Sequence, residues 1–378
     1  MDHTTKVLAI AESSMGHKTH IMTMQKYFES SSCYVDIYWS DQEREIFARV
    51  INRMLNLRFP NKLVQSHNLD LFRFRAQLGY ALLAKRLIDR KINQGDYNIL
   101  FFHTQPLAFL SLNLMQKMPS VVSIDMTNKQ AAEESTNKHK WTYSPNKFLE
   151  RQVYLKCSKI LTWTAWARSS VINDYGIHPD KVKVIPPGVD TTHLVFIDRN
   201  HKSSQDLYNI LFVGGDFKRK GGEDLLTVFL AQFADKAILH IVTSLNAVKC
   251  DHPNVCIYSG VEAYSSLWCE LYRQADAFVM PTYADAFGIV FIEAMASGLP
   301  VIASKLTQTT EIVREGETGF LITPGDRQEL ANKLQLLIDN PSLGRQMGKI
   351  ARQIVEERFD TQKNFQKIES IFEDLANA

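Results

Sequence analysis

The sequence predicts an α/β protein built from two doubly wound domains, and three observations support this prediction. The chain has 378 residues, which exceeds the size at which a single hydrophobic core usually keeps growing. Short apolar runs alternate with segments of helical period, the pattern of parallel strands joined by crossover helices. That pattern pauses near the middle of the chain and then starts again. We expect one domain over residues 1–195, a second over 196–360, and a terminal helix over 361–378 that packs back towards the first domain.

The expected strands are short runs rich in apolar residues and bounded by polar or turn residues. In the first half they are Val7–Ala11, Tyr34–Tyr38, Asn98–Phe102, Val121–Asp125 and Ile160–Trp163. In the second half they are Ile210–Val213, Ile238–Val242, Val255–Tyr258, Ala277–Met280, Val301–Ala303 and Phe320–Ile322. The join between the halves is expected near Pro186–Asp190 and in the polar stretch 198–206, which contains no apolar run.

Past residue 326 the periodicity indicates helices over 326–339, 343–357 and 361–375. The last of these carries one apolar stripe at helical spacing, so it needs a surface to cover that stripe. The stripe consists of Phe365, Ile368, Ile371, Phe372 and Leu375.

The composition excludes several classes of protein. With 45% hydrophobic and 22% charged residues, the chain is neither disordered nor collagen-like. No stretch of about twenty apolar residues is present, which argues against a membrane span. A net charge of +2 argues against nucleic acid as the main partner. The five cysteines contain no Cys-x-x-Cys pair, which argues against a disulfide framework and against a zinc site.

The loop after the first predicted strand, Ser13–His20, contains Gly16 and feeds a helix expected to begin near Lys18. Parallel sheets bind ligands at the carboxyl ends of their strands, so Gly16 is a candidate for close backbone approach to a phosphate. The spacing is not that of a dinucleotide-binding glycine motif, and a simple tight turn explains the loop equally well. We interpret His17 and His20 as cap or surface residues rather than catalysts.

A second glycine-containing loop follows the first strand of the second half. Gly214, Gly215, Gly221 and Gly222 flank the three consecutive cations Lys218–Lys220, directly before a predicted helix. Close backbone approach, a helix dipole and positive charge together suit a diphosphate. The alternative is a solvated basic turn, which the flanking glycines make less attractive.

The segment 281–300 is the most informative part of the chain. A helix starting near Ile289 leaves the amides of Gly288, Ile289 and Val290 facing an anion, while Glu293 lies one turn inside and can accept two vicinal hydroxyls. Asp285, just before the helix, is otherwise read as an ordinary N-terminal cap.

Together these segments resemble glycosyltransferase family 4, also called glycosyl transferases group 1, which are retaining enzymes of the GT-B fold. Asp285–Glu293 resembles the family's Glu-x7-Glu motif, with Phe-Gly before the second acid and Glu-Ala-x-Ala-x-Gly-x-Pro-Val starting at it. Gly214 and Arg219–Gly221 resemble its glycine and Arg-Lys-Gly, and Lys181–Asp190 resembles its join between domains. The resemblance covers most of the chain and is strongest over 160–322. It implies two Rossmann-like domains that face an interdomain cleft.

The resemblance also implies a role for each matching residue. Glu293 would hold the ribose of a nucleotide sugar, and Asp285 would contact hydroxyls of the transferred ring. Arg219 and Lys220 would neutralise the diphosphate in place of a metal ion, so no metal and no other cofactor is expected. Gly16 would close over the diphosphate from the first domain, and Val261 would lie near the base. The implied donor-binding set is Gly16, Gly214, Gly215, Arg219, Lys220, Val261, Phe287, Gly288, Ile289, Val290 and Glu293.

The sequence also departs from the family pattern. Asp285 stands where glutamate is more frequent, and Gly215 stands where many members carry another arginine. Where many members place a histidine near the reacting carbon, this chain has Asp125. Asp125 would orient the acceptor or stabilise the developing charge, with His103 sharing that work, although a structural loop cap explains either residue too. The implied catalytic set is Asp285, Glu293, Asp125 and His103.

Two tryptophans, Trp163 and Trp166, follow the last strand of the first half. They are interpreted either as lining of the acceptor side or, preferably, as packing beneath the interdomain join.

The predicted function is transfer of a sugar, with retention, from a nucleoside diphosphate donor to a glycan, lipid or small-molecule acceptor. A UDP-sugar is favoured, with GDP and ADP left open. Retention without an obvious carboxylate nucleophile suggests front-face displacement, in which the leaving phosphate takes the acceptor proton. Asp285 is the only other candidate for a nucleophile. The alternatives are a nucleotide-sugar epimerase or a phosphorylase on the same fold, and a non-catalytic nucleotide-sugar-binding partner protein.

The remaining feature is a stretch rich in positively charged residues. Between Glu43 and Lys91 there are eleven Lys or Arg residues against four acids, interleaved with apolar residues. Such a stretch, here 44–91, is compatible with peripheral contact with an anionic membrane. It is also compatible with helices whose apolar faces pack on the first domain while the arginines are solvated. We prefer this second interpretation. The apolar run Val7–Ile10 is too short for a secretory signal. We therefore expect a cytoplasmic protein, either free or peripheral on the inner face of the membrane.

Overall fold

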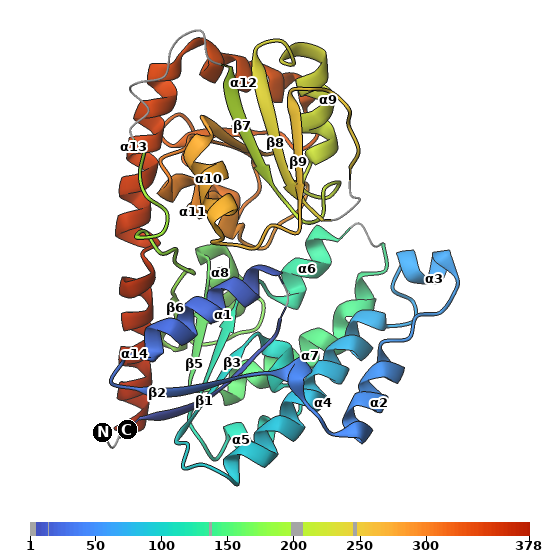
Figure 1. The fold of residues 1–378 in the computed structure, drawn as a ribbon. Coiled ribbons are helices and arrows are strands. Elements are labelled where there is room, and N and C mark those ends of the chain that lie inside the picture. Colours follow the sequence, from blue (N-terminus) through green and yellow to red (C-terminus); the bar gives the residue numbers. More distant parts are fainter. Residues whose placement is uncertain (1–4, 14, 136–137, 198–206, 245–247) are drawn as a thin grey trace. The chain divides into compact units, whose positions relative to one another are not determined.

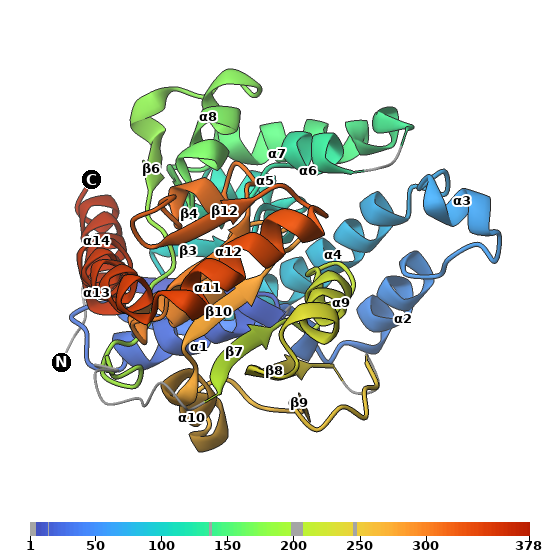
Figure 2. The same ribbon diagram turned by 90° about the horizontal axis from the view of Figure 1, so that it is seen from above.

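The computed structural model describes residues 5–13, 15–135, 138–197, 207–244 and 248–378. The chain forms two compact units (Figures 1 and 2): unit 1 comprises residues 1–186 together with 362–378, and unit 2 comprises 187–361. Each unit is built on one six-stranded sheet. The polar stretch 198–206, expected at the join, lies outside the described residues.

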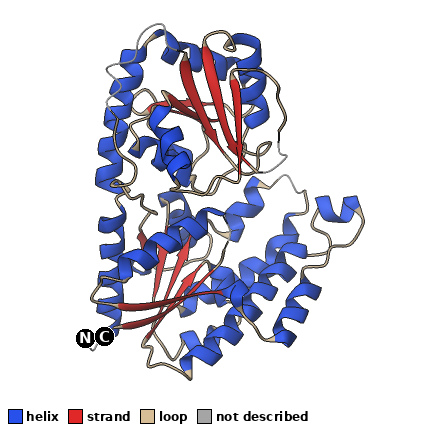
Figure 3. Cartoon of the chain, viewed as in Figure 1, coloured by secondary structure: helices blue, strands red, loops and turns tan. Residues whose placement is uncertain are grey.

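The sheet of unit 1 is entirely parallel (Figure 3), with the strand order β2, β1, β3, β4, β5, β6. All five strands expected here are present near their predicted bounds. Strand β6 was not predicted, because its three residues offer only two valines beside lysines and therefore no apolar run. The strands are β1 (Lys6–Ala11), β2 (Tyr34–Trp39), β3 (Ile99–His103), β4 (Ser120–Ile124), β5 (Lys159–Thr162) and β6 (Val182–Val184).

The helices of unit 1 connect these strands. Helix α1 begins at Met15 rather than near Lys18, so the prediction that Gly16 belongs to a loop was wrong. Gly16 is tolerated in the first helical turn because a single glycine costs only about 1 kcal/mol there. The helices are α1 (Met15–Phe28), α2 (Ile46–Leu55), α3 (Lys62–Ser66), α4 (Phe72–Ile92), α5 (Leu112–Met115), α6 (Asn128–Glu134), α7 (Ser144–Lys156), α8 (Ala165–Asn173) and α14 (Thr361–Ala376), with 3₁₀ turns at 40–42, 105–108, 140–143 and 179–181.

The apolar stripe of α14 packs on unit 1. Phe365, Ile368 and Phe372 are buried in the same apolar layer as Ile21 and Phe28 of α1. One polar contact supports the packing, since the Tyr27 hydroxyl donates a hydrogen bond to Glu369 Oε2 at 2.6 Å. The last helix of the chain therefore completes the core of the unit formed by its first residues.

The sheet of unit 2 is also parallel, with the strand order β12, β11, β10, β7, β8, β9. All six predicted strands are present. They are β7 (Tyr208–Val213), β8 (Ala237–Thr243), β9 (Val255–Ser259), β10 (Ala277–Met280), β11 (Val301–Ser304) and β12 (Gly319–Ile322). The helices are α9 (Gly222–Gln232), α10 (Ser266–Gln274), α11 (Ile289–Ala296), α12 (Arg327–Asp339) and α13 (Pro341–Arg358), with a 3₁₀ turn at 309–311.

The strand order of each sheet reverses at one point. In unit 1 the strand that follows β1 lies on one side of the β1–β3 pair, and the strands that follow β3 lie on the other side. In unit 2 the strands that follow β7 and those that follow β10 diverge in the same way. Loops that leave such strands diverge and open a crevice at the carboxyl edge of the sheet, the usual ligand site of open α/β sheets. Within the described residues, no helix combines the length and apolarity needed to cross a bilayer.

We predict that Phe372→Ala strongly destabilises unit 1, because it removes a fully buried side chain at a cost of about 3–5 kcal/mol. The measurement is urea unfolding followed by tryptophan fluorescence, which reports mainly on unit 1 because Trp39, Trp141, Trp163 and Trp166 all lie there. Gln366→Ala, at an exposed position of the same helix, is the control and should change little. Equal unfolding midpoints for both variants would show that α14 adds nothing to the core.

Candidate functional site

The glycine-containing loop after β7 is held close to the neighbouring strands of unit 2. The Thr243 hydroxyl, at the end of β8, donates to the Gly214 carbonyl at 2.8 Å. Gly221 caps α9 with a φ of 75°, and a Cβ there would overlap the Pro281 carbonyl oxygen. Only glycine fits this position, because it combines left-handed backbone with no room for a side chain. The loop after β7 therefore lies directly against the loop after β10.

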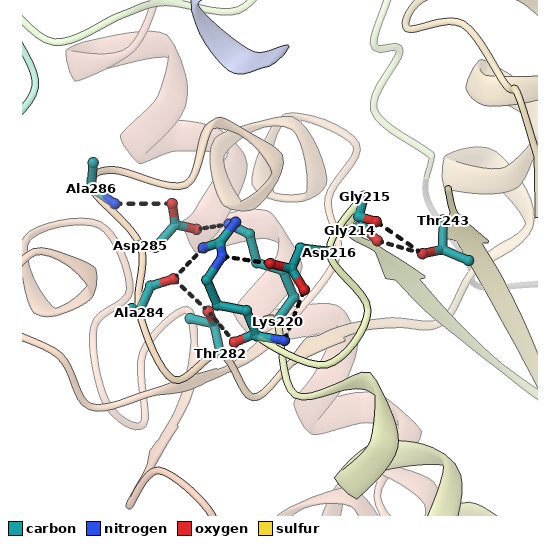
Figure 4. A network of polar contacts seen from close by, with 10 residues as sticks. Gly214, Gly215, Asp216, Lys220, Thr243, Thr282, Ala284, Asp285 and Ala286 are labelled. Carbon is teal, nitrogen blue, oxygen red and sulfur yellow. Dashed lines mark hydrogen bonds and ion pairs between the residues drawn. The ribbon is translucent and has the colours of Figure 1, made fainter. Parts of the chain in front are cut away.

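Two cations of this loop reach across to the loop after β10 (Figure 4). Lys220 Nζ forms an ion pair with Asp285 Oδ2, and both side chains are largely buried. Arg219 Nη1 donates to the Ala284 carbonyl at 2.7 Å, and its Nε donates to Asp216 Oδ2 at 3.0 Å. These contacts hold the charged ends of both side chains at the carboxyl edge of the sheet, where Arg219 remains partly exposed.

The N-terminus of α11 lies just beyond Asp285. Its cap residue is Gly288, with a φ of 87° and no side chain to accept from the first-turn amides. Asp285 does not cap this helix as an ordinary reading of the sequence suggests, since its Oδ1 accepts from the Ala286 amide at 3.0 Å instead. The first turn also lacks an acidic residue, so the positive end of the helix dipole is not neutralised from within the helix.

Glu293 is buried one turn inside α11, with 4% of its surface exposed. The Tyr272 hydroxyl donates to its Oε2 at 3.3 Å, and Tyr264 forms a second hydrogen bond with it. Burial raises the pKa of Glu293 to about 7, although the two tyrosine hydrogen bonds act in the opposite direction. The two tyrosines were not predicted, because a strand and two loops separate them from Glu293 in the sequence.

In unit 1, His17 connects two residues that were predicted separately. Its Nε2 lies 3.3 Å from Asp125 Oδ2, and its Nδ1 lies 3.0 Å from His103 Nε2. A protonated His17 donates to both. His17 comes from α1, His103 from the end of β3 and Asp125 from the loop after β4. The prediction that His17 is a cap or surface residue was therefore wrong, because parallel pairing of β1, β3 and β4 brings these chain ends together.

The environment favours a charged His17–Asp125 pair. Burial lowers the pKa of His17, but the hydrogen bond and charge of Asp125, with the charge of Glu12, outweigh it and raise the pKa overall. Burial raises the pKa of Asp125, but the hydrogen bond and charge of His17 outweigh it and lower the pKa overall. Burial lowers the pKa of His20 to about 3 and that of His103 well below its usual value. Of the three histidines, His17 is therefore the one whose protonated form the surroundings favour.

The surroundings of this cluster are closely packed. Trp163 is buried and its ring lies against those of His17, His20 and His103, with ring centroids 4.9–5.7 Å apart. The loop after Asp125 ends in a capping box, in which Thr127 and Gln130 satisfy each other's backbone amides at the start of α6. His103 itself is 1% exposed, so it supports His17 rather than facing solvent.

The predicted donor-binding residues are unevenly distributed. Gly214, Gly215, Arg219, Lys220, Asp285 and the first turn of α11 with Gly288, Ile289 and Val290 gather around the reversal point of the unit 2 sheet, and Phe287 is buried beside them. Val261 lies in the loop after β9, the edge strand of that sheet. Gly16 lies in unit 1.

Comparison with known proteins identifies the chain. The model of Glycosyltransferase Family 4 matches residues 15–193, and that of Glycosyl transferases group 1 matches residues 196–354. The chain belongs to the group 1, family 4 glycosyltransferases. One relative of this chain is the capsular polysaccharide biosynthesis glycosyltransferase CapM of Staphylococcus aureus, 30% identical over 46% of this chain and 48% of CapM. The matched region thus spans about half the length of such curated relatives.

Solved structures share the fold over nearly the whole chain. Sucrose-phosphate synthase from Thermosynechococcus elongatus superimposes with a TM-score of 0.74 at 17% identity, over 98% of this chain and 99% of the synthase. HepE from Anabaena, in complex with UDP-glucose, gives a TM-score of 0.68 at 17% identity, over 98% and 99% of the two chains. The fold is GT-B, with two Rossmann-like α/β units.

We predict that Glu293→Gln stabilises the protein at pH 8 but not at pH 5. The folded-state pKa of about 7 exceeds the unfolded value, so the stability that Glu293 contributes is complete below about pH 4.5 and is lost as the pH rises through 7. Between those limits the native chain should lose up to about 3 kcal/mol relative to the variant.

The measurement is the free energy of unfolding in urea at several pH values. Glu357→Gln, at an exposed position of α13, is the control and should follow the native profile. A constant difference between Glu293→Gln and the native chain from pH 5 to pH 8 would contradict the assignment of a raised pKa.

Proposed function

We propose that this chain is a retaining glycosyltransferase that moves a sugar from a nucleoside diphosphate sugar to a glycan, lipid or small-molecule acceptor. The observation that carries the proposal is the grouping of Arg219 and Lys220 with the uncapped N-terminus of α11, in front of the buried Glu293. That grouping suits a diphosphate joined to a ribose. A UDP-sugar is favoured because HepE, which has the same fold, was solved with UDP and with UDP-glucose.

In this proposal the donor binds through three kinds of group. The first-turn amides of α11 donate hydrogen bonds to the phosphate oxygens, and the positive end of the helix dipole favours the same negative charge. Arg219 and Lys220 neutralise the diphosphate charge, so no metal ion is required. Glu293 accepts hydrogen bonds from two ribose hydroxyls and must be ionised to do so with both oxygens.

The Lys220–Asp285 ion pair has a specific part in this scheme. Before the donor binds, each charge is neutralised by the other within a largely buried contact, which lowers the cost of burying them. With a donor bound, Lys220 pairs with the phosphates instead. Asp285 can then accept hydrogen bonds from hydroxyls of the transferred sugar. The ion pair thus holds both side chains next to the reacting centre until the donor binds.

The proposed reaction is a front-face displacement. The bond from the anomeric carbon to the diphosphate oxygen breaks, and its electron pair leaves with the diphosphate. The acceptor oxygen bonds to the anomeric carbon on the same face, and its proton passes to the departing phosphate oxygen. Arg219 and Lys220 stabilise the negative charge that develops there.

On the acceptor side we propose that Asp125 and His17 act together. Asp125 stands where many family members have a histidine, and His17 supplies an imidazole beside it at 3.3 Å. Asp125 orients the acceptor hydroxyl, and the charged His17 keeps that carboxylate ionised. His103 accepts from His17 and holds the ring in position.

We predict that Lys220→Ala and Glu293→Ala each lower the transfer rate by at least about tenfold, equivalent to about 1.4 kcal/mol of transition-state stabilisation. The measurement is steady-state transfer or, without an acceptor, slow donor hydrolysis. Lys218→Ala is the matched control, because Lys218 is an exposed cation two residues away and should leave the rate nearly unchanged. If all three variants behaved like the native chain, the site assignment would be wrong.

We predict that one class of nucleotide sugar raises the melting temperature selectively, since a ligand that binds only the folded state stabilises it. The panel comprises UDP-, GDP-, ADP- and dTDP-sugars, each with and without EDTA, and EDTA should have no effect. Loss of activity with EDTA would overturn the metal-independent scheme. Epimerised donor, phosphate-dependent breakdown, or binding without any turnover would instead support the epimerase, the phosphorylase or the non-catalytic binding protein, respectively.

A further inference from the structure

The segment 46–63 of unit 1 exposes an unusual number of apolar side chains. On α2 they are Ile46, Phe47, Val50 and Met54, with exposed fractions from 51% to 79%, and beyond α2 they are Leu57, Phe59 and Leu63, each at least 60% exposed. Figures 1 and 2 show α2 and α3 beyond α4, on the side of α4 away from the sheet. We call this surface the α2–α3 face.

The α2–α3 face is not the inner side of an ordinary amphipathic helix. Helix α4 does pack its apolar residues inward, since Leu83, Leu87 and Ile88 are buried. Helix α2 buries only Ala48, whereas its large apolar residues Ile46, Phe47, Val50 and Met54 are exposed. Packing on the first domain therefore explains the apolar residues of α4, but it does not explain those of α2.

All the charged residues of the same segment are positive. Residues 46–66 contain no Asp or Glu, and their four cations, Arg49, Arg53, Arg58 and Lys62, are all exposed. On α2, Arg49 and Arg53 lie beside the exposed apolar arc, because each residue turns the helix by about 100°. A cavity of about 400 Å³ between α2 and α4 is also lined by these two arginines, with Asp41 as the one acid in its wall.

We propose that the α2–α3 face docks on the surface of an anionic phospholipid bilayer. Its apolar side chains enter the boundary between headgroups and acyl chains, and its cations contact lipid phosphates, each contributing about 1 kcal/mol near such a surface. A second copy of the chain suits this face poorly, because a twofold contact would set four cations against the same four cations. The inference goes beyond the proposed function and does not depend on the donor.

The test is sedimentation of the full chain with vesicles of phosphatidylcholine alone or mixed with phosphatidylglycerol. We expect binding to the anionic vesicles to be at least about tenfold tighter than to the neutral ones and to weaken with salt. Arg49→Gln with Arg53→Gln should weaken it at least about tenfold. Phe47→Gln with Met54→Gln should weaken it similarly at all salt concentrations, since it removes insertion rather than charge.

Three controls isolate the face. Lys26→Gln with Lys117→Gln removes the same net charge from exposed positions elsewhere in unit 1 and should bind like the native chain. Leu336→Gln, an exposed apolar residue of unit 2, should also bind normally. Lys220→Ala should bind vesicles normally even if the proposed donor site fails, so the two proposals are tested separately.

The contrary outcomes are equally defined. Equal binding to neutral and anionic vesicles, or equal loss in the lysine control, would overturn the proposal. Concentration-dependent dimerisation in sedimentation velocity, abolished by the α2 variants, would show that a second copy covers the face instead. Melting temperatures of the variants at exposed positions should stay close to that of the native chain, which would confirm that folding is retained.

Discussion

Parallel strand pairing is the constraint on which the rest of this structure depends. Because every paired strand runs in the same direction, all the loops that carry chemistry leave each sheet at one edge. The reversals of strand order at β1 with β3 and at β7 with β10 then separate neighbouring loops and leave helix N-termini facing the opening. His17 meets His103 and Asp125 for this reason, and Lys220 meets Asp285 for the same reason, although 65 residues separate the latter pair.

Both units keep ionisable groups in surroundings that are costly for charge. In unit 2, burial raises the pKa of Glu293 towards neutrality. Ionising this carboxyl group therefore lowers the free energy of unfolding. Lys220 and Asp285 avoid a similar cost by pairing. A protein selected for stability alone would gain by replacing such groups with apolar ones. A polar, charged ligand that pairs with these groups would account for their presence where the strand order reverses.

The cluster in unit 1 follows the same principle with a different arrangement. Of its three histidines, two are driven to the neutral state by burial, and the third is held charged by Asp125. The carboxylate at the position where many family members have a histidine therefore does not stand alone, because α1 supplies an imidazole to it. Away from this cluster, α2 combines exposed apolar residues with unopposed cations, a pattern that packing within unit 1 does not require.

The sequence by itself determined the α/β class, every described strand except β6, and the segments of unit 2 that carry charge. It could do so because hydrophobic period, glycines and cations act locally along the chain. Asp285, Glu293 and Lys220 were identifiable for that reason. Only the tertiary structure decided that His17 pairs with Asp125, that Tyr264 and Tyr272 form hydrogen bonds with Glu293, and that Gly16 lies within a helix. It also separated α4, which buries several of its apolar residues, from α2, which buries only Ala48 and leaves its large apolar residues exposed. These facts depend on contacts between distant parts of the chain, and no local period or motif encodes which of two apolar helices a neighbour will cover.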